Sequence, residues 1–323
     1  MQDLTGRHVL VTGGAGFIGY NLARRLSEIG AMVVVYDNLS GMGSAERAEN
    51  LKALNIRCVI ADIFDRNELL LAAKGVDIIF HLAALSSVPE SYANPQKDCQ
   101  INVLGTVNVL NTARVVDAPV IFTSSSTVYG IPQKTPTPED HPLHPISFYG
   151  LSKLVAEKYC QAYHETYGLP TVLLRLFNVY GPEAVTGVSY DFLKKIKANN
   201  RRLEVIGSGE QSKDFIYVDD TVDALIRVAQ IDRAIGEVYN VGSGSTINVV
   251  KLTEEILNLL GLLGVTKIIC GVQDDWPGDV TCTHADITKI KQQLGWEPKT
   301  TLEEGFLKTI KWFESKYGPI VYR

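Results

Sequence analysis

One stretch near the N-terminus constrains the fold more than any other. A continuous apolar run, His8–Thr12, is followed by glycines in the spacing Gly-x-x-Gly-x-x-Gly and then by apolar residues at helical spacing. The pattern predicts a strand, then a glycine-rich turn, then a helix. Glycines let the backbone approach a pyrophosphate closely, and the helix start offers it free N–H groups. The spacing differs from the commoner Gly-x-Gly-x-x-Gly, but the flanking strand and helix are the context that a dinucleotide-binding turn requires.

A second strand indicates the kind of dinucleotide. Met32–Tyr36 is apolar and ends at Asp37, about 20 residues after the glycines. A carboxylate there accepts hydrogen bonds from the adenosine ribose and repels a 2′-phosphate. Residues 38–41 include no Arg or Lys, so NAD is favoured over NADP. Asp37 could also be a turn residue after a strand, and the glycine turn upstream is what favours the binding role.

Further apolar runs of strand length continue the alternation. Strands are expected over Arg57–Ala61, Asp77–Leu82 and Pro119–Thr123, and a helix over Cys99–Val116. Strands without inside–outside alternation are buried on both faces, as in a parallel sheet flanked by helices. We therefore predict an α/β fold with a doubly wound, Rossmann-like parallel sheet, whose ligands bind at the carboxyl ends of the strands. The residues at those ends are Gly13, Asp37, Asp62, Ala84 and Ser124.

Composition narrows the function. Of 323 residues, 46% are hydrophobic, which allows a sizeable core. The net charge of −5 argues against a nucleic-acid-binding protein, whose binding face would be basic. No run approaches about 18 apolar residues and no signal-peptide pattern opens the chain, so a cytoplasmic protein without membrane contact is expected. The 5 cysteines have no metal-ligand spacing and are expected to be reduced thiols.

The histidines give no reason to expect a metal either. His141 and His144 lie beside carboxylates, but in a proline-rich loop whose geometry suits a metal poorly. His81, at the end of a strand, is expected to be a packed residue and not a catalyst. We therefore predict no metal site.

Tyr149 and Lys153 are four residues apart in an expected helical turn, so both side chains leave one face. A phenol titrates near pH ~10, and keeping it half ionised at pH 7 requires roughly 4 kcal/mol, which a nearby ammonium can partly supply. Such pairs are common on helix surfaces, so the spacing alone is weak support for catalysis. Together with the glycine turn and the hydroxyls at 123–127, however, the pair suits oxidation of an alcohol by hydride transfer.

The motifs of the chain occur in an order that one known family shares. They are Thr12–Gly19, His81–Ala84, Ser124–Gly130, Tyr149 with Lys153, Arg175–Pro182, Gly207–Gln211, Asp214–Asp220, Asn240–Gly242, Pro277–Val280 and Ala285–Asp286. Over essentially its whole length the chain resembles the extended short-chain dehydrogenase/reductase family, specifically its nucleotide-sugar epimerases and dehydratases. The resemblance implies an NAD-binding domain over 1–177, which regains about 215–245, and a smaller, discontinuous substrate-binding domain over most of 178–323. In this C-terminal part, Val218–Ala229 is expected to pass from a strand into a helix, Ile247–Leu263 to be a helix, and Asn240 and its neighbours to return to the main sheet.

The resemblance also implies roles for individual residues. Tyr149 would remove the proton of the sugar 4-hydroxyl, Lys153 would lower the pKa of Tyr149 and bind the nicotinamide ribose, and Ser125 would hydrogen-bond the developing 4-oxygen. These three are the implied catalytic residues. The residues implied to bind NAD are Gly13, Gly16, Phe17, Ile18, Gly19, Asp37, Asn38, Ser40, Gly41, Asp62, Ile63, Leu82, Ala83, Ala84, Asn102, Thr123, Tyr149, Lys153 and Phe177.

Two positions after Ser125 distinguish reactions within this family. Dehydratases that resemble this chain carry Asp-Glu there, because eliminating water needs an acid and a base, and related decarboxylases place Glu at the second position. Here the two positions hold Ser126 and Thr127. Because neither position carries an ionisable group, the 4-keto intermediate can neither lose water nor lose CO₂. Its remaining reaction is to take hydride back on its other face. The resemblance therefore implies 4-epimerisation without net redox change.

The substrate implied by the resemblance is a UDP-sugar. Lys213 and Trp276 stand where the family usually has phosphate-binding arginines, and the Trp-Pro-Gly-Asp version resembles archaeal-type UDP-galactose 4-epimerases. Thr283 is small where epimerases restricted to unmodified hexoses have Tyr, which leaves room for an N-acetyl group. We predict UDP-glucose/UDP-galactose interconversion, with UDP-GlcNAc/UDP-GalNAc also accepted. The implied substrate contacts are Ser86, Ser125, Ser126, Tyr149, Asn178, Val188, Val205, Lys213, Trp276 and Thr283.

Two other functions stay open. UDP-glucuronate 4-epimerases also have a small residue at the Thr283 position, and the hydroxyls of residues 125–127 could hold a C5 carboxylate. A non-catalytic NAD-sensing regulator could share the fold. The family often dimerises by pairing helices, here about Cys99–Val116 and Leu151–Tyr167, so a homodimer is expected.

Overall fold

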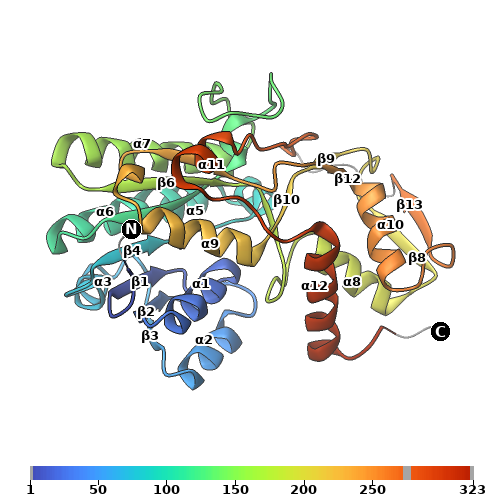
Figure 1. The fold of residues 1–323 in the computed structure, drawn as a ribbon, viewed down its shortest axis with the longest axis horizontal. Coiled ribbons are helices and arrows are strands. Elements are labelled where there is room, and N and C mark those ends of the chain that lie inside the picture. The colour runs from blue at the N-terminus through green and yellow to red at the C-terminus, as the bar shows by residue number, and fades with distance from the viewer. Residues whose placement is uncertain (1–2, 272–277, 321–323) are drawn as a thin grey trace.

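The computed structural model describes residues 3–271 and 278–320, and within them one seven-stranded sheet organises the chain (Figure 1). Its strands are parallel and stand in the order β11-β6-β5-β4-β1-β2-β3. The order reverses direction between β1 and β4, which confirms the predicted doubly wound fold. The bounds are β1 His8–Thr12, β2 Met32–Asp37, β3 Arg57–Ile60, β4 Ile78–His81, β5 Val120–Ser125, β6 Thr171–Leu176 and β11 Val238–Val241.

Helices cover both faces of this sheet (Figure 1). Val9 and Val11 pack in one core with Leu22, whereas Leu10 lies in a second core with Val109. Successive residues of a strand thus face opposite layers and both are buried, which explains the continuous apolar runs. The helices are α1 Phe17–Glu28, α2 Ser44–Ala53, α3 Arg66–Ala73, α4 Val88–Ala93, α5 Pro95–Cys99, α6 Gly105–Val116, α7 Phe148–Tyr167, α8 Val188–Ala198, α9 Val218–Ala229, α10 Val249–Leu259, α11 Thr288–Leu294 and α12 Leu302–Tyr317.

The strands expected from the apolar runs are present, with ends that differ from the predicted ones by at most two residues. β5 continues to Ser125, beyond the predicted end at Thr123. The hydroxyls of residues 123–125 therefore lie on the strand and not in the turn after it. Because Ser125 pairs with Leu176 of β6, it is held more firmly than a turn residue would be.

The helix expected over Cys99–Val116 is longer and changes character along its length. Helical backbone starts at Pro95 in α5, passes through a π-helical segment, η1 Gln100–Leu104, and continues as α6 to Val116. Such single-turn π segments are frequent at functional sites. This one contains Asn102, a residue implied to contact the cofactor.

Two predicted elements of the C-terminal part are corrected. Val218–Ala229, predicted as a strand leading into a helix, is helical throughout, and the strand precedes it as β10 Phe215–Tyr217. The predicted helix Ile247–Leu263 is the short strand β12 Ile247–Asn248 followed by α10. Asn248 caps α10, its side-chain oxygen accepting from Val250 N at 2.8 Å, so the helix begins only after this residue.

Small two-stranded sheets complete the C-terminal part. β7 Asn178–Tyr180 pairs with β10, β8 Arg202–Val205 with β13 Lys267–Cys270, and β9 Ser212–Lys213 with β12. The predicted return of the chain to the main sheet is confirmed, because β11 pairs with β6 in parallel. Figure 1 shows α8, α10 and α12 gathered at the end of the molecule away from α3 and α6.

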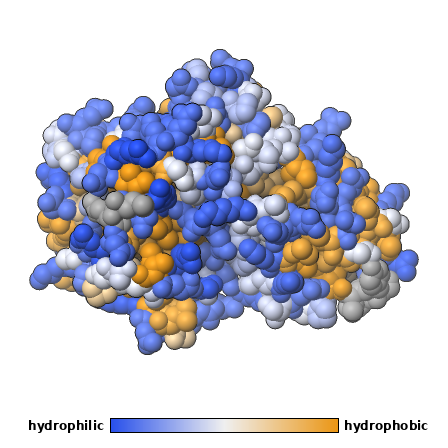
Figure 2. Space-filling view, in the orientation of Figure 1, coloured by the Kyte–Doolittle hydropathy of each residue, from blue (hydrophilic) through white to orange (hydrophobic). Residues whose placement is uncertain are grey.

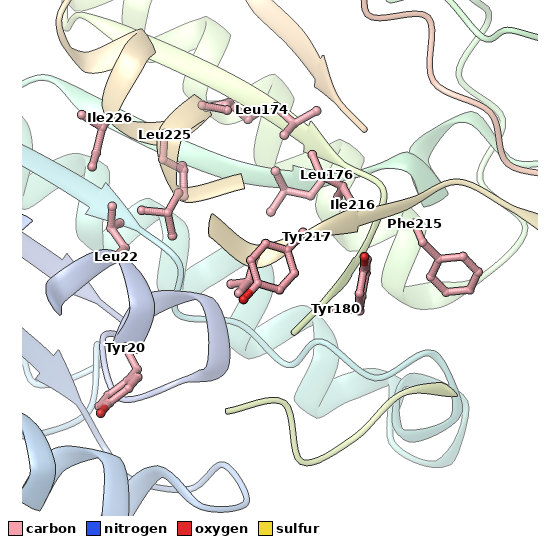
Figure 3. Close-up of a cluster of buried hydrophobic side chains, with 14 of the residues drawn as sticks. Tyr20, Leu22, Leu174, Leu176, Tyr180, Phe215, Ile216, Tyr217, Leu225 and Ile226 are labelled. Atoms are coloured by element: carbon pink, nitrogen blue, oxygen red, sulfur yellow. The ribbon is translucent and has the colours of Figure 1, made fainter. Parts of the chain in front are cut away.

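Buried aromatic side chains, among them Tyr180, Phe215 and Tyr217, lie on the strands after β6 (Figure 3), and Tyr180 also contacts α12. Tyr180 of β7 stacks on Phe306 of α12 with 4.6 Å between ring centroids, and it meets Tyr217 of β10 edge-on at 5.8 Å. A Cβ on Gly305 would lie 2.1 Å from the Tyr180 hydroxyl oxygen. Only glycine therefore lets α12 approach this closely.

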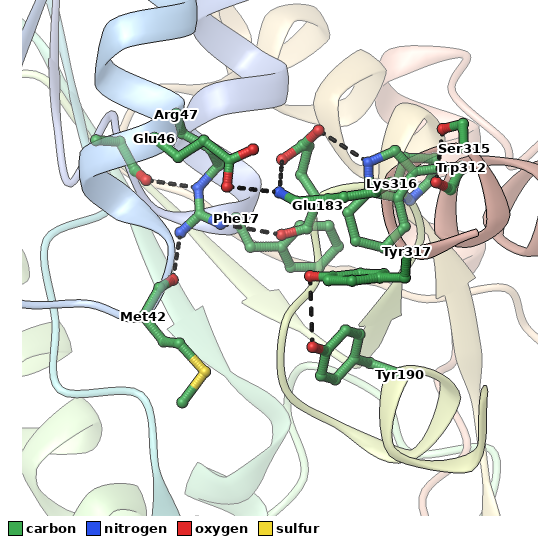
Figure 4. Close-up of polar contacts among 12 residues, drawn as sticks. Phe17, Met42, Glu46, Arg47, Glu183, Tyr190, Trp312, Ser315, Lys316 and Tyr317 are labelled. Atoms are coloured by element: carbon green, nitrogen blue, oxygen red, sulfur yellow. Dashed lines mark hydrogen bonds and ion pairs between the residues drawn. The ribbon is translucent and has the colours of Figure 1, made fainter. Parts of the chain in front are cut away.

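A polar junction centred on Glu183 ties α2 to α12 (Figure 4). The Glu183 carbonyl oxygen accepts from Arg47 Nη1 at 3.2 Å, and its carboxylate accepts from Trp312 Nε1 at 2.9 Å. Lys316 Nζ lies 4.0 Å from Glu183 Oε2 and 2.9 Å from Glu46 Oε2. Glu183 has a φ of +73°, a rare conformation for a residue with a side chain, and bonds from both sides hold it there.

A buried ion pair holds α7 against the sheet. Arg175 of β6 and Glu157 of α7 have side chains that are 3% and 0% exposed. Arg175 Nε and Nη2 donate to the two oxygens of Glu157 at 3.0 and 2.8 Å. Arg175 Nη1 also donates to the Tyr129 hydroxyl at 3.0 Å and to the Glu139 carbonyl at 2.9 Å. The guanidinium is thus surrounded by acceptors, as a buried charge requires.

The surface on the side seen in Figure 2 is mainly hydrophilic, with hydrophobic side chains in smaller areas. Large apolar side chains also stay exposed along α6 and α7, namely Val115, Leu151, Tyr159 and Tyr167. Within the part of the chain that the structure describes, no helix is both long and apolar enough to span a membrane.

Glu157→Ala is expected to lower the free energy of unfolding by about 3–5 kcal/mol, because it leaves the Arg175 charge buried without its partner. Glu49→Ala, which removes the partner of Lys52 in an exposed pair, should leave stability nearly unchanged. Denaturant unfolding of both variants measures the difference. Equal effects in the two variants would contradict the role of the buried pair.

Candidate active site

The glycine turn between β1 and α1 is shaped by close packing. Gly13 has a φ of +69°, and a Cβ on it would lie 2.5 Å from the Ala83 backbone nitrogen, just after β4. A Cβ on Gly19 would lie 2.2 Å from the Gly13 carbonyl oxygen. Gly16 precedes α1, and no side chain of the described residues caps this helix end. The turn is a cradle of backbone N–H groups, the chemistry that holds a pyrophosphate.

Asp37 stands at the end of β2, beside this turn. Its Oδ2 accepts from Ala15 N at 3.0 Å and its Oδ1 from Leu39 N at 2.8 Å. Burial raises the pKa of Asp37 above its ordinary value, although these bonds act in the opposite direction. Asn38 Nδ2 donates to Asp62 Oδ2 at 2.7 Å, so the ends of β2 and β3 meet as predicted.

Arg47 supports the glycine turn from α2 and was not among the residues predicted for the site. Its Nε donates to the Ala15 carbonyl at 2.7 Å and its Nη2 to the Met42 carbonyl at 2.8 Å. With the bond to Glu183, the guanidinium connects the turn to the junction with α12. The sequence carries no signal for this, because a charged residue within a polar helix is typical of a solvated face.

His81, at the end of β4, is packed as expected. Its Nδ1 lies 2.7 Å from Thr12 Oγ1 and its Nε2 lies 3.0 Å from Thr106 Oγ1. Burial lowers the pKa of His81 to about 3, so the ring is neutral. The imidazole therefore ties β1, β4 and α6 together beneath the cofactor cradle.

Asn102, implied to contact the cofactor, has a side chain that is bonded inside the protein and 1% exposed. It accepts from Leu85 N at 2.9 Å and donates to Leu85 O at 3.1 Å. It also donates to Asp98 Oδ1 at 2.9 Å and to Ser152 Oγ at 3.0 Å. Through these bonds, Asn102 holds the loop after β4 against α7. The buried Asp98 is a residue of this group that the sequence did not single out.

Ser125 and Tyr149 come from β5 and from the first turn of α7. Ser147 caps α7 by accepting from Gly150 N at 3.0 Å, and Tyr149 N donates to Ser91 Oγ at 3.1 Å. Burial raises the pKa of Tyr149 to about 12, while a hydrogen bond with Ser125 favours the phenolate. The sequence motifs far apart in the chain thus bring the two hydroxyls together.

Lys153, one turn further along α7, is buried. Its Nζ donates to the Thr123 carbonyl oxygen at 2.7 Å and lies 4.8 Å from the centre of the Phe122 ring. Burial lowers the pKa of Lys153 to about 8. At Tyr149, burial has the largest effect on the pKa, and the effect that opposes it comes from the hydrogen bond with Ser125.

Asn178 and Thr283, predicted on the substrate side, lie together. Asn178 Nδ2 donates to Thr283 Oγ1 at 3.1 Å and to the Asp214 carbonyl at 2.9 Å. The buried Asp214 carboxylate accepts from Ser243 N at 2.7 Å and from Ala285 N at 3.0 Å. Asp214 therefore fixes the segment that carries Thr283. In the sequence, Asp214 is recognisable only as part of the Asp214–Asp220 motif.

Lys213, expected to face the phosphates, is already paired in the chain. Its Nζ donates to Asp279 Oδ1 at 2.7 Å and also contacts the Val280 carbonyl. A diphosphate would have to compete with this carboxylate for the ammonium. Trp276, predicted beside it, lies outside the described residues.

The other residues predicted to contact substrate or cofactor differ in how far they are buried. Ser86 is exposed, and Ser126 and Val188 are partly buried. Val205 is 1% exposed and its side chain belongs to the core. Ile63 and Phe177 are also buried. Ile63 Cδ1 would lie 2.3 Å from a Cβ on Gly105, so Ile63 packs against the start of α6.

The proline-rich loop has no group of residues arranged for a metal. His141 Nε2 accepts from Gln133 N at 2.9 Å, and its Nδ1 lies 2.7 Å from the Pro142 carbonyl. Over residues 3–271 and 278–320, no cluster of three or more His, Cys, Asp or Glu side chains could hold a metal ion.

A glycine turn suited to a dinucleotide, with Ser, Tyr and Lys side chains near it, is typical of Rossmann-type enzymes that oxidise hydroxyl groups. A family model described as GDP-mannose 4,6 dehydratase matches residues 10–309. A UDP-glucose 4-epimerase of Mycolicibacterium smegmatis is 36% identical over 318 residues, which cover 95% of this chain and 98% of that protein. The chain belongs to the family of nucleotide-sugar epimerases and dehydratases.

Solved structures give the same relationship. A UDP-N-acetylglucosamine 4-epimerase from Methanobrevibacter ruminantium, in complex with UDP-N-acetylmuramic acid, is 34% identical with a TM-score of 0.88, covering 97% of this chain and 99% of that one. A UDP-glucuronic acid 4-epimerase from Bacillus cereus, in complex with UDP-glucuronic acid and NAD, is 27% identical with a TM-score of 0.88 and covers 96% and 100%. These relatives share one fold and act on different sugars.

Gly13→Ala is expected to destabilise the protein more than Gly75→Ala. Both glycines have positive φ, at +69° and +74°, so each substitution costs about 1–2 kcal/mol from the backbone. Around Gly75 a Cβ meets nothing within 4 Å, whereas at Gly13 it meets the Ala83 backbone, which adds about 1–3 kcal/mol. Thermal denaturation compares the two. Equal losses of stability would contradict the packing of the cradle.

Proposed function

We propose that the protein is a UDP-hexose 4-epimerase that uses NAD and interconverts UDP-glucose and UDP-galactose. The observation that carries this proposal is the meeting of Ser125 and Tyr149 at the carboxyl edge of the sheet. The two positions after Ser125 hold hydroxyls and not carboxylates. Family membership supports the general reaction, and these positions support epimerisation within it.

The glycine cradle, Asp37 and the loops after β3 and β4 fit a dinucleotide. The turn leaves no room for a Cβ, its N–H groups suit a pyrophosphate, and Asp37 can accept from ribose hydroxyls. Bound NAD supplies the acceptor and donor of the hydride at carbon 4 of the sugar. Tyr149 and Lys153 would border the nicotinamide end, and Asp37, Asn38, Ser40 and Gly41 the adenosine end.

In this proposal Tyr149 is the base for the sugar 4-hydroxyl. Ser125 donates a hydrogen bond to the developing oxygen, and Tyr149 accepts the proton and later returns it. With a pKa of about 12 in the chain alone, Tyr149 needs added positive charge nearby before it can ionise at neutral pH. Lys153, whose pKa is about 8, is mostly protonated at pH 7 and provides one such charge.

The side chains near Tyr149 include no suitable acid for elimination or decarboxylation. Ser126 and Thr127 are poor acids, because hydroxyls do not titrate near neutral pH. Asp98 is the carboxylate that acts on Tyr149 in the described chain, but it is buried and bonded to Asn102. A 4-keto sugar in this site therefore has hydride return as its available step.

The substrate side supports a pocket with room at carbon 2 of the sugar. Thr283 is small, and its Oγ1 accepts from Asn178 Nδ2 and from Asp214 N at 3.2 Å. We propose that UDP-GlcNAc and UDP-GalNAc are accepted as well. The Lys213 ammonium would turn from Asp279 toward the diphosphate.

Three further expectations belong to this proposal. The chain would comprise an NAD-binding domain over 1–177, joined by about 215–245, and a substrate-binding domain over most of 178–323. Two copies would pair through α6 and α7, whose exposed apolar side chains suit such a contact. The enzyme would act in the cytoplasm.

Incubation of the purified protein with each UDP-sugar, followed by NMR of the products, tests the proposal. We expect UDP-glucose and UDP-galactose to interconvert. Conversion of UDP-glucuronate alone would favour the uronate epimerase, a product with lost carbon or a 6-deoxy sugar would indicate a lyase, and no turnover of any UDP-sugar would favour a non-catalytic NAD-binding regulator.

Tyr149→Phe is expected to lower kcat by about 10²–10⁴-fold, because the phenylalanine ring cannot carry the proton. Tyr159→Phe, on the exposed face of the same helix, should leave kcat unchanged. Steady-state rates with UDP-galactose measure both. Comparable rates in Tyr149→Phe and the parent would exclude Tyr149 as the base.

Thr283→Tyr is expected to lower kcat/KM for UDP-GalNAc by at least about tenfold relative to UDP-galactose, because the ring would fill the space at carbon 2. Thr283→Ser keeps the hydroxyl that binds Asn178 and should preserve the ratio. The ratio of the two kcat/KM values is the measurement, since it cancels general damage to the site. An unchanged ratio in Thr283→Tyr would contradict the pocket.

A further inference from the structure

The Ser125 hydroxyl receives two hydrogen bonds from one residue. Thr127 Oγ1 donates to Ser125 Oγ at 3.0 Å, and Thr127 N donates to the same atom at 3.3 Å. Ser125 is 9% exposed and forms the N-cap of the short 3₁₀ helix η2 Ser126–Tyr129. The contact is therefore part of the way the chain leaves β5.

These two bonds decide where the Ser125 proton points. A hydroxyl has one O–H donor and two acceptor lone pairs. Thr127 occupies both acceptor positions, so the donor of Ser125 is directed away from Thr127. That donor is left for the side of Tyr149, whose pKa is raised by burial and lowered by hydrogen bonding with the Ser125 side chain.

We propose that Thr127 is a positioning residue for the reaction: its hydroxyl orients the single donor of Ser125 toward the side of Tyr149, where it would bond the sugar 4-oxygen once substrate is bound. The inference rests on the proposed epimerase function and deepens it. It assigns a role to Thr127, which stands at one of the two positions after Ser125 that lack an acid. Thr127 and Ser125 then form an ordered row of donors that ends at the base.

Thr127 is itself fixed against the helix that carries Tyr149. A Cβ on Gly150, next to Tyr149, would lie 2.7 Å from the Thr127 carbonyl oxygen. The same oxygen accepts from Gly130 N at 3.3 Å. The residues that follow, Val128 and Tyr129, are buried in a small core. Thr127 therefore cannot move relative to the first turn of α7 without disturbing this packing.

The consequence is a change in the proton affinity of Tyr149 when the Thr127 hydroxyl is removed. The donor from Ser125 favours the phenolate, so a disordered Ser125 raises the pKa of Tyr149. The charged and titratable groups around the pair are Lys153, Glu157 and Cys160 of α7, Asp98 of α5 and His81 of β4. A substitution at Thr127 leaves all of these in place.

Thr127→Val is the direct test, because valine keeps the shape and loses the hydroxyl. With UDP-galactose we expect kcat to fall by about tenfold or more and KM to change by less than about twofold, since the lost interaction acts in the transition state. The midpoint of the rising limb of kcat against pH should move to higher pH. Thr127→Ser should restore both the rate and the midpoint.

Thr253→Val serves as the matched control. It removes a buried threonine hydroxyl that bonds to the Val249 carbonyl at 2.8 Å within α10, far from Tyr149 in the sequence and on another element. It should leave kcat and the pH midpoint unchanged. Thermal denaturation of every variant verifies folding, and Thr127→Ala replaces Thr127→Val in the comparison if the valine variant does not fold.

The outcomes separate this inference from the proposed function. If the parent enzyme epimerises UDP-galactose and Thr127→Val has the parent's kcat and pH midpoint, the positioning role is overturned and the epimerase stands. If Thr127→Ser is as impaired as Thr127→Val, packing and not the hydroxyl is responsible, which also overturns it. If the parent enzyme turns over no UDP-sugar, the proposed function fails and the inference fails with it.

Discussion

The buried ion pair between Arg175 and Glu157 is the interaction on which the geometry of the site depends. Glu157 lies on α7, one turn after Lys153, and Arg175 lies on β6, beside the strand that ends in Ser125. Removing two charges from water is costly, so the pair persists only because Arg175 meets acceptors on every side, including Tyr129. The result is a fixed distance between helix and strand, and with it between base and hydroxyl.

The cofactor cradle depends on a different constraint, the absence of side chains. Gly13 lies against the end of β4 so closely that any Cβ would overlap backbone atoms. Buried polar groups around it hold the turn in place by hydrogen bonds. Arg47 of α2 binds the turn, and His81 links β1 to α6. In the proposed function, the reaction on this scaffold depends on a local feature, the hydroxyls of the two residues after Ser125.

Much of the fold could be predicted because its signals are local. The apolar run before the glycines and the strand that ends at Asp37 are found where the sequence indicated. Even the return of the chain at Asn240 was foreseeable from the family motifs. The predictions that failed concern element boundaries that depend on tertiary context. Val218–Ala229 is helical throughout, because its apolar side is buried in the core.

The sequence by itself determined the strand, turn and helix order and the preference for NAD at Asp37, since these follow from residue type and short spacing, and its family motifs indicated the proposed reacting groups. Only the tertiary structure decided the partners of those groups. Lys153 binds the Thr123 carbonyl, Lys213 is paired with Asp279, and burial raises the pKa of Tyr149. The physical reason is that desolvation and hydrogen bonding depend on segments far apart in the chain, which no local pattern records.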